Sequence, residues 1–308
     1  MSLSKFLDPK NDFAFRKIFG AEKHKDILIH FLNDMLEFHE EGKIQKVVFL
    51  RPVQDPDIAA KKQSIVDVLC TDEKGRQYIV EMQVARAKGF EKRAQFYAAK
   101  AYSSQLNVGD DYRNLKEIIF LAITDFVMFP DKKEYKSDHV ILDKSSFDRD
   151  LKDFYFSFLE LPKFNKAIDE LTTIVEKWAY FFKHASHTDP ADLEKIIGDD
   201  SVIGQAYQVL NQYYWSESDL HTYEREKKSE MDARAIMAQK IDEGIAQGIA
   251  QGIAQGVIQG EKRKAIEIAK ALLQEMIPIN QVSRVTGLTD EELTSLSRCE
   301  SVVREESL

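Results

Sequence analysis

Two short apolar runs joined by a turn constrain the fold of this chain more than any other feature. Residues 65–71 and 77–84 have the β-branched and aromatic composition of strands, and the segment 72–75 between them ends in glycine. If residues 73–75 form the loop of a hairpin, Asp72 pairs with Arg76. The sequence therefore predicts an antiparallel hairpin with a defined register.

This register places acidic side chains together in an apolar setting. Counting back from the turn puts Asp67 opposite Glu81, with Cβ atoms about 5 Å apart. Because side chains alternate along a strand, Gln83 shares the face of Glu81. The side chains expected to face the core are those of Val66, Val68, Val80, Met82 and Val84. A shift of one residue would bury the carboxylates instead, so the pattern specifies the register.

Two carboxylates this close in an apolar sheet repel each other and lose hydration. A hard cation such as Mg²⁺ or Mn²⁺ relieves both costs, because it takes oxygen ligands from carboxylates, water and phosphate. We expect Asp67 and Glu81 as metal ligands and the backbone carbonyl of Met82 as a third. The bound metal would activate water and stabilise charge on a phosphate. The residues alone leave open an alternative in which both acids lie on a solvated sheet face.

The order of predicted elements around the hairpin indicates one α/β domain over residues 1–165. Asp8 and Pro9 are expected to begin a first helix that Gly20 ends. Residues 115–124 form a nearly continuous apolar run, which is typical of a central strand covered on both faces. Further helices are expected at 23–36 and 87–106, and further strands at 44–50, 140–142 and 154–161. Helices, a strand meander, a helix and a buried strand together predict a mixed sheet flanked by helices.

The second half of the chain is predicted to be all-helical. Residues 166–225 are expected to form a helical extension packed on the core. Residues 226–261 are highly charged and then repeat Gly-Ile-Ala-Gln, and a period of four places the isoleucines on one drifting helical stripe. Each interior glycine costs roughly 1 kcal/mol relative to alanine. Two interpretations stay open: a homo-oligomeric helix joined through Ile245, Ile249, Ile253 and Val257, or a tolerated linker.

Residues 262–308 are expected to form a small C-terminal helical module. The segment 279–296 has the rhythm of a helix-turn-helix, with a turn at Gly287 and a capping box from Thr289 to Glu292. Its second helix begins with acidic residues, which argues against insertion into a DNA groove. A packing module is therefore the favoured interpretation.

Composition sets outer limits on the class of protein. The net charge of −9 counts against a protein that coats nucleic acid through bulk positive charge, although it permits a local basic cleft. No run approaches the ~18 apolar residues of a membrane span. The two cysteines lie far apart in unlike contexts, so a reduced cytoplasmic location without membrane contact is expected.

Several stretches in order resemble the Rpn family of recombination-promoting nucleases, in the PD-(D/E)XK nuclease superfamily. They are LDPKNDFAFRKIFG at 7–20, IVDV at 65–68, VEMQ at 80–83, RAQFY at 93–97, Gly-x-x-Tyr at 109–112, ELPKF at 160–164 and the Gly-x-x-x-Gly tail. The resemblance covers essentially the whole chain. It implies a restriction-endonuclease-like fold and a metal-dependent nuclease.

Carried over by position, the resemblance implies that Asp67 and Glu81 are the metal ligands. Gln83 stands where the superfamily usually has lysine, and Val66 stands where it usually has proline. Glutamine can bind water or phosphate but adds no charge. We therefore expect Arg93 or Lys92 to supply the missing cation.

Two more positions are expected to lie near this site. Gln95 is a candidate for contact with the active site or DNA. Asp12 would either approach the metal or, as we favour, supply negative charge at its helix N-terminus.

The expected function is a Mg²⁺-dependent DNA endonuclease, and the resemblance links it to recombination or mobile elements. The alternative is a nuclease-fold protein with weak or no activity. Such a protein would act through DNA or protein binding and through self-association.

Overall fold

The computed structural model describes residues 5–50, 53–54, 64–86, 88–198 and 200–296. The chain divides into two compact units, Met1–Met231 and Asp232–Leu308. Within the described residues, none of the helices has the length and apolar character needed to cross a membrane.

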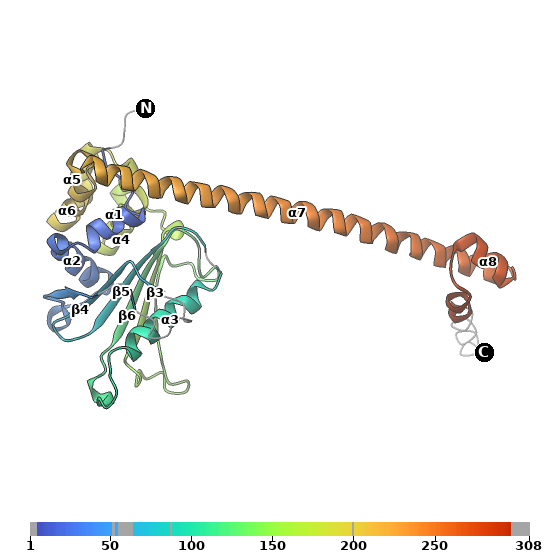
Figure 1. The fold of residues 1–308 in the computed structure, drawn as a ribbon, viewed down its shortest axis with the longest axis horizontal. Coiled ribbons are helices and arrows are strands. Elements are labelled where there is room, and N and C mark those ends of the chain that lie inside the picture. Colours follow the sequence, from blue (N-terminus) through green and yellow to red (C-terminus); the bar gives the residue numbers. More distant parts are fainter. Residues whose placement is uncertain (1–4, 51–52, 55–63, 87, 199, 297–308) are drawn as a thin grey trace. The chain divides into compact units, whose positions relative to one another are not determined.

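A mixed six-stranded sheet forms the centre of the first unit (Figure 1). Its strands, in spatial order, are β1 (Val47–Phe49), β4 (Val68–Asp72), β5 (Gln77–Gln83), β6 (Ile118–Thr124), β8 (Phe154–Glu160) and β7 (Lys136–Val140). The pairs β5–β6 and β6–β8 are parallel, and the other pairs are antiparallel. Every residue of β6 is buried, as its apolar run predicts. A separate pair, β2 (Val53–Gln54) and β3 (Ser64–Ile65), is antiparallel.

Helices cover both faces of this sheet, so the fold is the mixed sheet flanked by helices that the sequence predicts. The helix α3 (Phe90–Ser103) packs on one face, with Ile79 and Phe120 beneath it. The opposite face, which carries Val80 and Met82, packs against a second group of helices. They are α1 (Asp12–Phe19), α2 (Lys25–Met35), α4 (Ile174–His184), α5 (Leu193–Ile197) and α6 (Ser201–Leu210).

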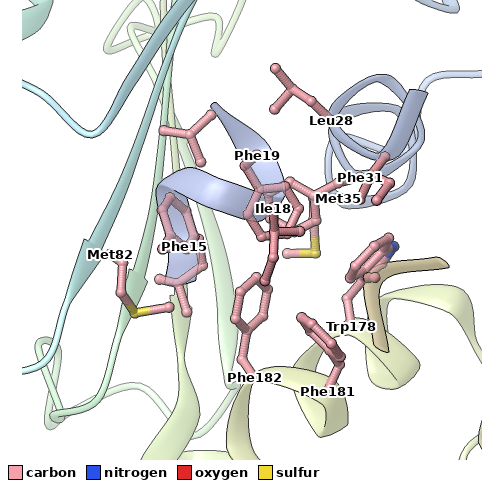
Figure 2. Close-up of a cluster of buried hydrophobic side chains, with 14 of the residues drawn as sticks. Phe15, Ile18, Phe19, Leu28, Phe31, Met35, Met82, Trp178, Phe181 and Phe182 are labelled. Carbon is pink, nitrogen blue, oxygen red and sulfur yellow. The ribbon is translucent and has the colours of Figure 1, made fainter. Parts of the chain in front are cut away.

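Aromatic packing fixes α1 against the back of the hairpin. Figure 2 shows Phe15 beside Met82 of β5, and Phe19 among Phe31, Trp178 and Phe182. The ring of Phe19 lies 4.7 Å from that of Phe31 and 5.8 Å from that of Phe182, between centroids. Fully burying one such side chain stabilises the fold by about 1.5–3 kcal/mol. The rotation of α1 about its axis is therefore set by this core.

The start of α1 differs from the prediction. Asn11, not Asp8, caps the helix, because its side chain accepts hydrogen bonds from the N–H groups of Phe13 and Ala14. Asp8 instead accepts from the N–H of Lys10, which makes a turn ahead of the helix. Gly20 ends the helix as expected.

The prediction that Val66 shares a face with Val68 is also wrong. The strand is interrupted between Ile65 and Val68, so the alternation of side chains is broken there. Val66 packs with Leu69 and Ile79 beneath α3, whereas Val68 lies in the other core.

A single long helix, α7 (Glu217–Gln274), contains the charged segment and the whole four-residue repeat. Ile245, Ile249, Ile253 and Val257 are all more than half exposed. A Cβ added to any of the glycines from Gly244 to Gly260 would meet nothing within 4 Å. The repeat is thus a helix whose apolar stripe has no partner among the described residues.

The second unit ends in a small helical cluster. The helix α8 (Ile279–Thr286) stops at Gly287, whose φ of 72° suits glycine, and residues 290–296 form a further helix. Ala269, Val282, Leu288 and Leu293 form the buried core. The capping box is present, since Thr289 and Glu292 exchange side-chain hydrogen bonds with each other's backbone.

Candidate functional site

The turn between β4 and β5 is held by a buried carboxylate. Asp72 Oδ1 accepts hydrogen bonds from the N–H groups of Lys74 and Arg76, and Oδ2 accepts from Arg76 Nε and the Tyr78 hydroxyl. The N–H of Asp72 donates to the carbonyl of Arg76 at 3.0 Å, and Gly75 has a φ of 82°. The predicted pairing of Asp72 with Arg76 is confirmed.

The register that follows from this turn brings Asp67 and Glu81 together. Val68 pairs with Val80, so Asp67 lies across from Glu81, one residue before β4 begins. Asp67 Oδ2 accepts a hydrogen bond of 3.0 Å from the N–H of Met82. The carbonyl of Gln83 points toward β6, where it accepts a hydrogen bond from the N–H of Asp125. Because carbonyls alternate along a strand, the carbonyl of Met82 points to the other edge of β5, toward Asp67.

Glu81 is buried beneath α3, with 3% of its surface exposed. The alternative of a solvated sheet face is therefore wrong. Its Oε2 accepts a hydrogen bond of 3.0 Å from Gln83 Nε2. Its Oε1 is buried and has no hydrogen-bond partner among the described residues. A buried acceptor of this kind carries the full desolvation cost unless something pairs with it.

Gln83 links this carboxylate to α3. Gln83 Oε1 accepts a hydrogen bond from the Arg93 guanidinium, which lies 4.8 Å from the Phe90 ring centroid and 5.9 Å from that of Tyr97. Arg93 therefore belongs to the cluster around the two carboxylates. Lys92 and Gln95 are exposed on α3, and Gln95 donates to the carbonyl of Glu91, so the structure does not bring these two into it.

The helix α1 adds a cation that the sequence did not single out. Arg16 Nε lies 3.5 Å from Asp67 Oδ1, and its guanidinium lies 3.6 Å from Asp12 Oδ2. The i,i+4 spacing of Asp12 and Arg16 was visible in the sequence. Their position over the hairpin depends on the aromatic core behind α1, which the sequence does not place.

Burial shifts the titration of both acids. Burial and, to a lesser extent, the negative charge of Asp67 together raise the pKa of Glu81 to about 8. Burial also raises the pKa of Asp67 to about 6, against the hydrogen bond from Met82, which lowers it. The charge of Asp12 adds to the rise at Asp67, and Arg16 and Arg93 oppose it. The site thus disfavours two negative charges unless a cation is added.

These groups fit a divalent cation. Glu81 Oε1 is a buried oxygen that no described residue pairs with, and Asp67 and the Met82 carbonyl supply further hard donors. The described residues contain no group of three or more His, Cys, Asp or Glu side chains placed to hold a metal. The remaining ligands would have to be water and phosphate oxygens, which is the usual arrangement for Mg²⁺.

A mixed sheet with helices on both faces, an Asp before one strand and Glu-x-Gln on its antiparallel neighbour define a PD-(D/E)XK nuclease fold. A model of the family described as PD-(D/E)XK nuclease family transposase matches residues 9–240, well over half of the chain. The chain therefore belongs to this family. Nucleases of this superfamily generally use divalent metals. No significant match was found among curated proteins or among solved structures.

A second family model matches residues 262–298 and is described as the C-terminal HTH domain of the Rpn/YhgA-like nuclease family. This match favours a DNA-binding helix-turn-helix over the packing module preferred from the sequence. The acidic start of the last helix has a structural use, because Glu292 completes the capping box and pairs with Lys262 at 2.7 Å. Glu292 therefore counts less against DNA binding than its charge suggested.

The raised pKa values predict how pH changes the stability of the metal-free protein. The pKa values of Asp67 and Glu81 are higher in the folded state than in the unfolded state. Their contribution to the free energy of unfolding is therefore present below about pH 4 and is lost as the pH rises through 6 to 8. Replacing Glu81→Gln should raise the free energy of unfolding at a pH above 8, on the order of 1.4 kcal/mol per pKa unit. Urea unfolding in EDTA measures this.

The matched control is Glu134→Gln, at an exposed position on a loop. It should leave stability unchanged at both ends of the pH range. Equal stability of Glu81→Gln and the parent protein above pH 8 would show that the Glu81 pKa is not raised.

Proposed function

We propose that this chain is a DNA endonuclease that hydrolyses phosphodiester bonds with Mg²⁺ or Mn²⁺. The observation that carries the proposal is the buried Glu81 Oε1, which lies beside a second carboxylate and has no hydrogen-bond partner in the part of the chain that the structure describes. Asp67, Glu81 and the Met82 carbonyl would hold the metal. The bound metal supplies Lewis acidity and lowers the pKa of a coordinated water.

The chain's own residues would orient the reactants. Gln83 has an amide that can bind water or a phosphate oxygen. The hydrogen bond from Arg93 to Gln83 Oε1 fixes the orientation of this amide, because another Gln83 rotamer would lose that bond. Arg93 is thus a positioning residue. DNA is the proposed substrate because the family is one of nucleases and the C-terminal domain is of a DNA-binding class.

A role in recombination or in the movement of mobile elements is part of the proposal. It rests on the transposase description of the family. A cytoplasmic location is proposed on the cysteine usage alone.

Asp67→Asn should abolish nicking of supercoiled DNA in Mg²⁺, with a loss of at least ~100-fold, because a neutral amide is a poor ligand for a hard cation. The measurement is the rate of conversion of supercoiled to open-circular plasmid by the full chain. Asp131→Asn, at an exposed loop position, is the matched control and should cleave at the parent rate. Equal cleavage by Asp67→Asn and the parent would remove this site from the reaction.

The second candidate function is self-association without catalysis, through the apolar stripe of α7. The observation that favours it is the exposure of Ile245, Ile249 and Ile253, at 56%, 58% and 63%. Glycines beside them have open space, so a second helix could approach the backbone closely. Pairing of two such stripes would offset the helix-weakening effect of the glycines.

Ile253→Lys tests this candidate in the full chain, since a lysine on the stripe would place charge in the contact. The mass measured by light scattering should fall toward that of a monomer. Ile258→Lys, equally exposed but off the stripe, should leave the mass unchanged. A monomeric parent protein, or the same mass for both variants, would exclude the stripe as the contact.

A further inference from the structure

We propose that Arg16 supplies to the scissile phosphate the positive charge that position 83 lacks. This inference rests on the proposed nuclease function. It assigns to α1 a role that the hairpin alone cannot fill, because glutamine carries no charge. Arg16 would contact a non-bridging phosphate oxygen directly.

The contacts of Arg16 leave its hydrogen-bonding capacity unused. Its ion pairs with Asp12 and Asp67 span 3.6 and 3.5 Å, longer than charge-assisted hydrogen bonds of about 2.7–2.9 Å. Within the described chain, no hydrogen bond from its side chain is found. A guanidinium has five N–H donors and can bind two phosphate oxygens at once. Its side chain is 48% exposed, so an incoming phosphate can reach it.

Other cations near the site have closer partners. Arg93 donates to Gln83 and lies over the Phe90 ring, and its buried Nε has no hydrogen-bond partner among the described residues. Lys10 pairs with Asp125 at 3.0 Å and is 18% exposed. Lys17 pairs with Asp219 at 2.6 Å and lies over the Trp215 ring. Of these four cations, Arg16 has the weakest contacts and the position beside Asp67.

Buried aromatic side chains anchor α1, the helix that carries Arg16. Phe15 and Phe19 flank it in sequence, and both are fully buried in the core that joins α1 to Met82 (Figure 2). The same helix turn therefore presents an aromatic anchor to the core and a guanidinium to the carboxylate pair. Because the backbone of α1 is fixed in this way, the guanidinium stays within reach of the position where negative charge would develop.

The role proposed is electrostatic. Arg16 keeps its proton and forms no covalent bond. It would stabilise negative charge on the phosphate while water adds and the ester oxygen leaves. The ordinary alternative is a structural ion pair that only holds Asp67 in position.

Full-length Arg16→Ala and Arg16→Lys separate these roles. We expect Arg16→Ala to lower kcat for plasmid nicking by roughly 10²-fold, with a smaller change in KM. Arg16→Lys should keep part of the rate. Guanidinium chloride, below concentrations that unfold the protein, should partly restore Arg16→Ala. Arg113→Ala, an exposed arginine paired with Asp111, is the matched control and should keep the parent rate.

Calorimetry with Mn²⁺ gives a readout that does not depend on cleavage. Arg16→Ala should bind Mn²⁺ at least as tightly as the parent, because a positive charge beside Asp67 has been removed. A parent rate in Arg16→Ala would overturn the proposal and leave the nuclease function intact. Loss of rate together with weaker Mn²⁺ binding and no rescue would assign Arg16 a structural role instead. An inactive parent protein would overturn both proposals.

Discussion

The hydrogen bonds of the Asp72 carboxylate are the constraint on which the candidate site depends. Four donors converge on this side chain and close the turn between β4 and β5. Because the turn fixes the register, it decides that Asp67 meets Glu81. A slip of one residue would exchange the two faces of β5, moving Glu81 into the core behind the sheet and Met82 beneath α3. Between the turn and the site, β4 and β5 pair continuously from Thr71 and Gln77 to Val68 and Val80, so the register set at the turn is kept at the site.

The same hairpin thus contains two buried carboxylates with opposite surroundings. Asp72 has hydrogen-bond partners on both oxygens, whereas among the described residues Glu81 has a partner on Oε2 and none on Oε1, beside another acid. A buried polar group left unpaired costs about 1–3 kcal/mol, and more when it is charged. A protein carries such a cost where a ligand recovers it, which is typical of functional sites. The two arginines beside Asp67 and Glu81 differ in their contacts. Arg93 donates a hydrogen bond to Gln83, whereas Arg16 is half exposed beside Asp67.

Local rules predicted a large part of this fold and site. The turn residues gave the hairpin register, and the unbroken apolar run gave the buried strand β6. The start of α1 was misplaced because Asp8 and Asn11 both have side chains that can cap a helix, and local sequence alone does not distinguish them. Val66 was assigned to the wrong face of the sheet because the apolar pattern does not show that the strand is interrupted at residues 66 and 67. The contribution of Arg16 was missed because it depends on how α1 docks behind β5. The length of α7 was missed because its glycines argue locally against a continuous helix.

Everything proposed for this site depends on the binding of a divalent cation by the Asp67–Glu81 pair. Calorimetric titration of the full chain with Mn²⁺ tests it most directly, because it requires neither substrate nor turnover. We expect a binding event in the parent protein that Asp67→Asn and Glu81→Gln each abolish or weaken at least ~10-fold, since each removes a negatively charged oxygen ligand. Absence of binding in the parent protein, or equal binding in the parent and both variants, would contradict it.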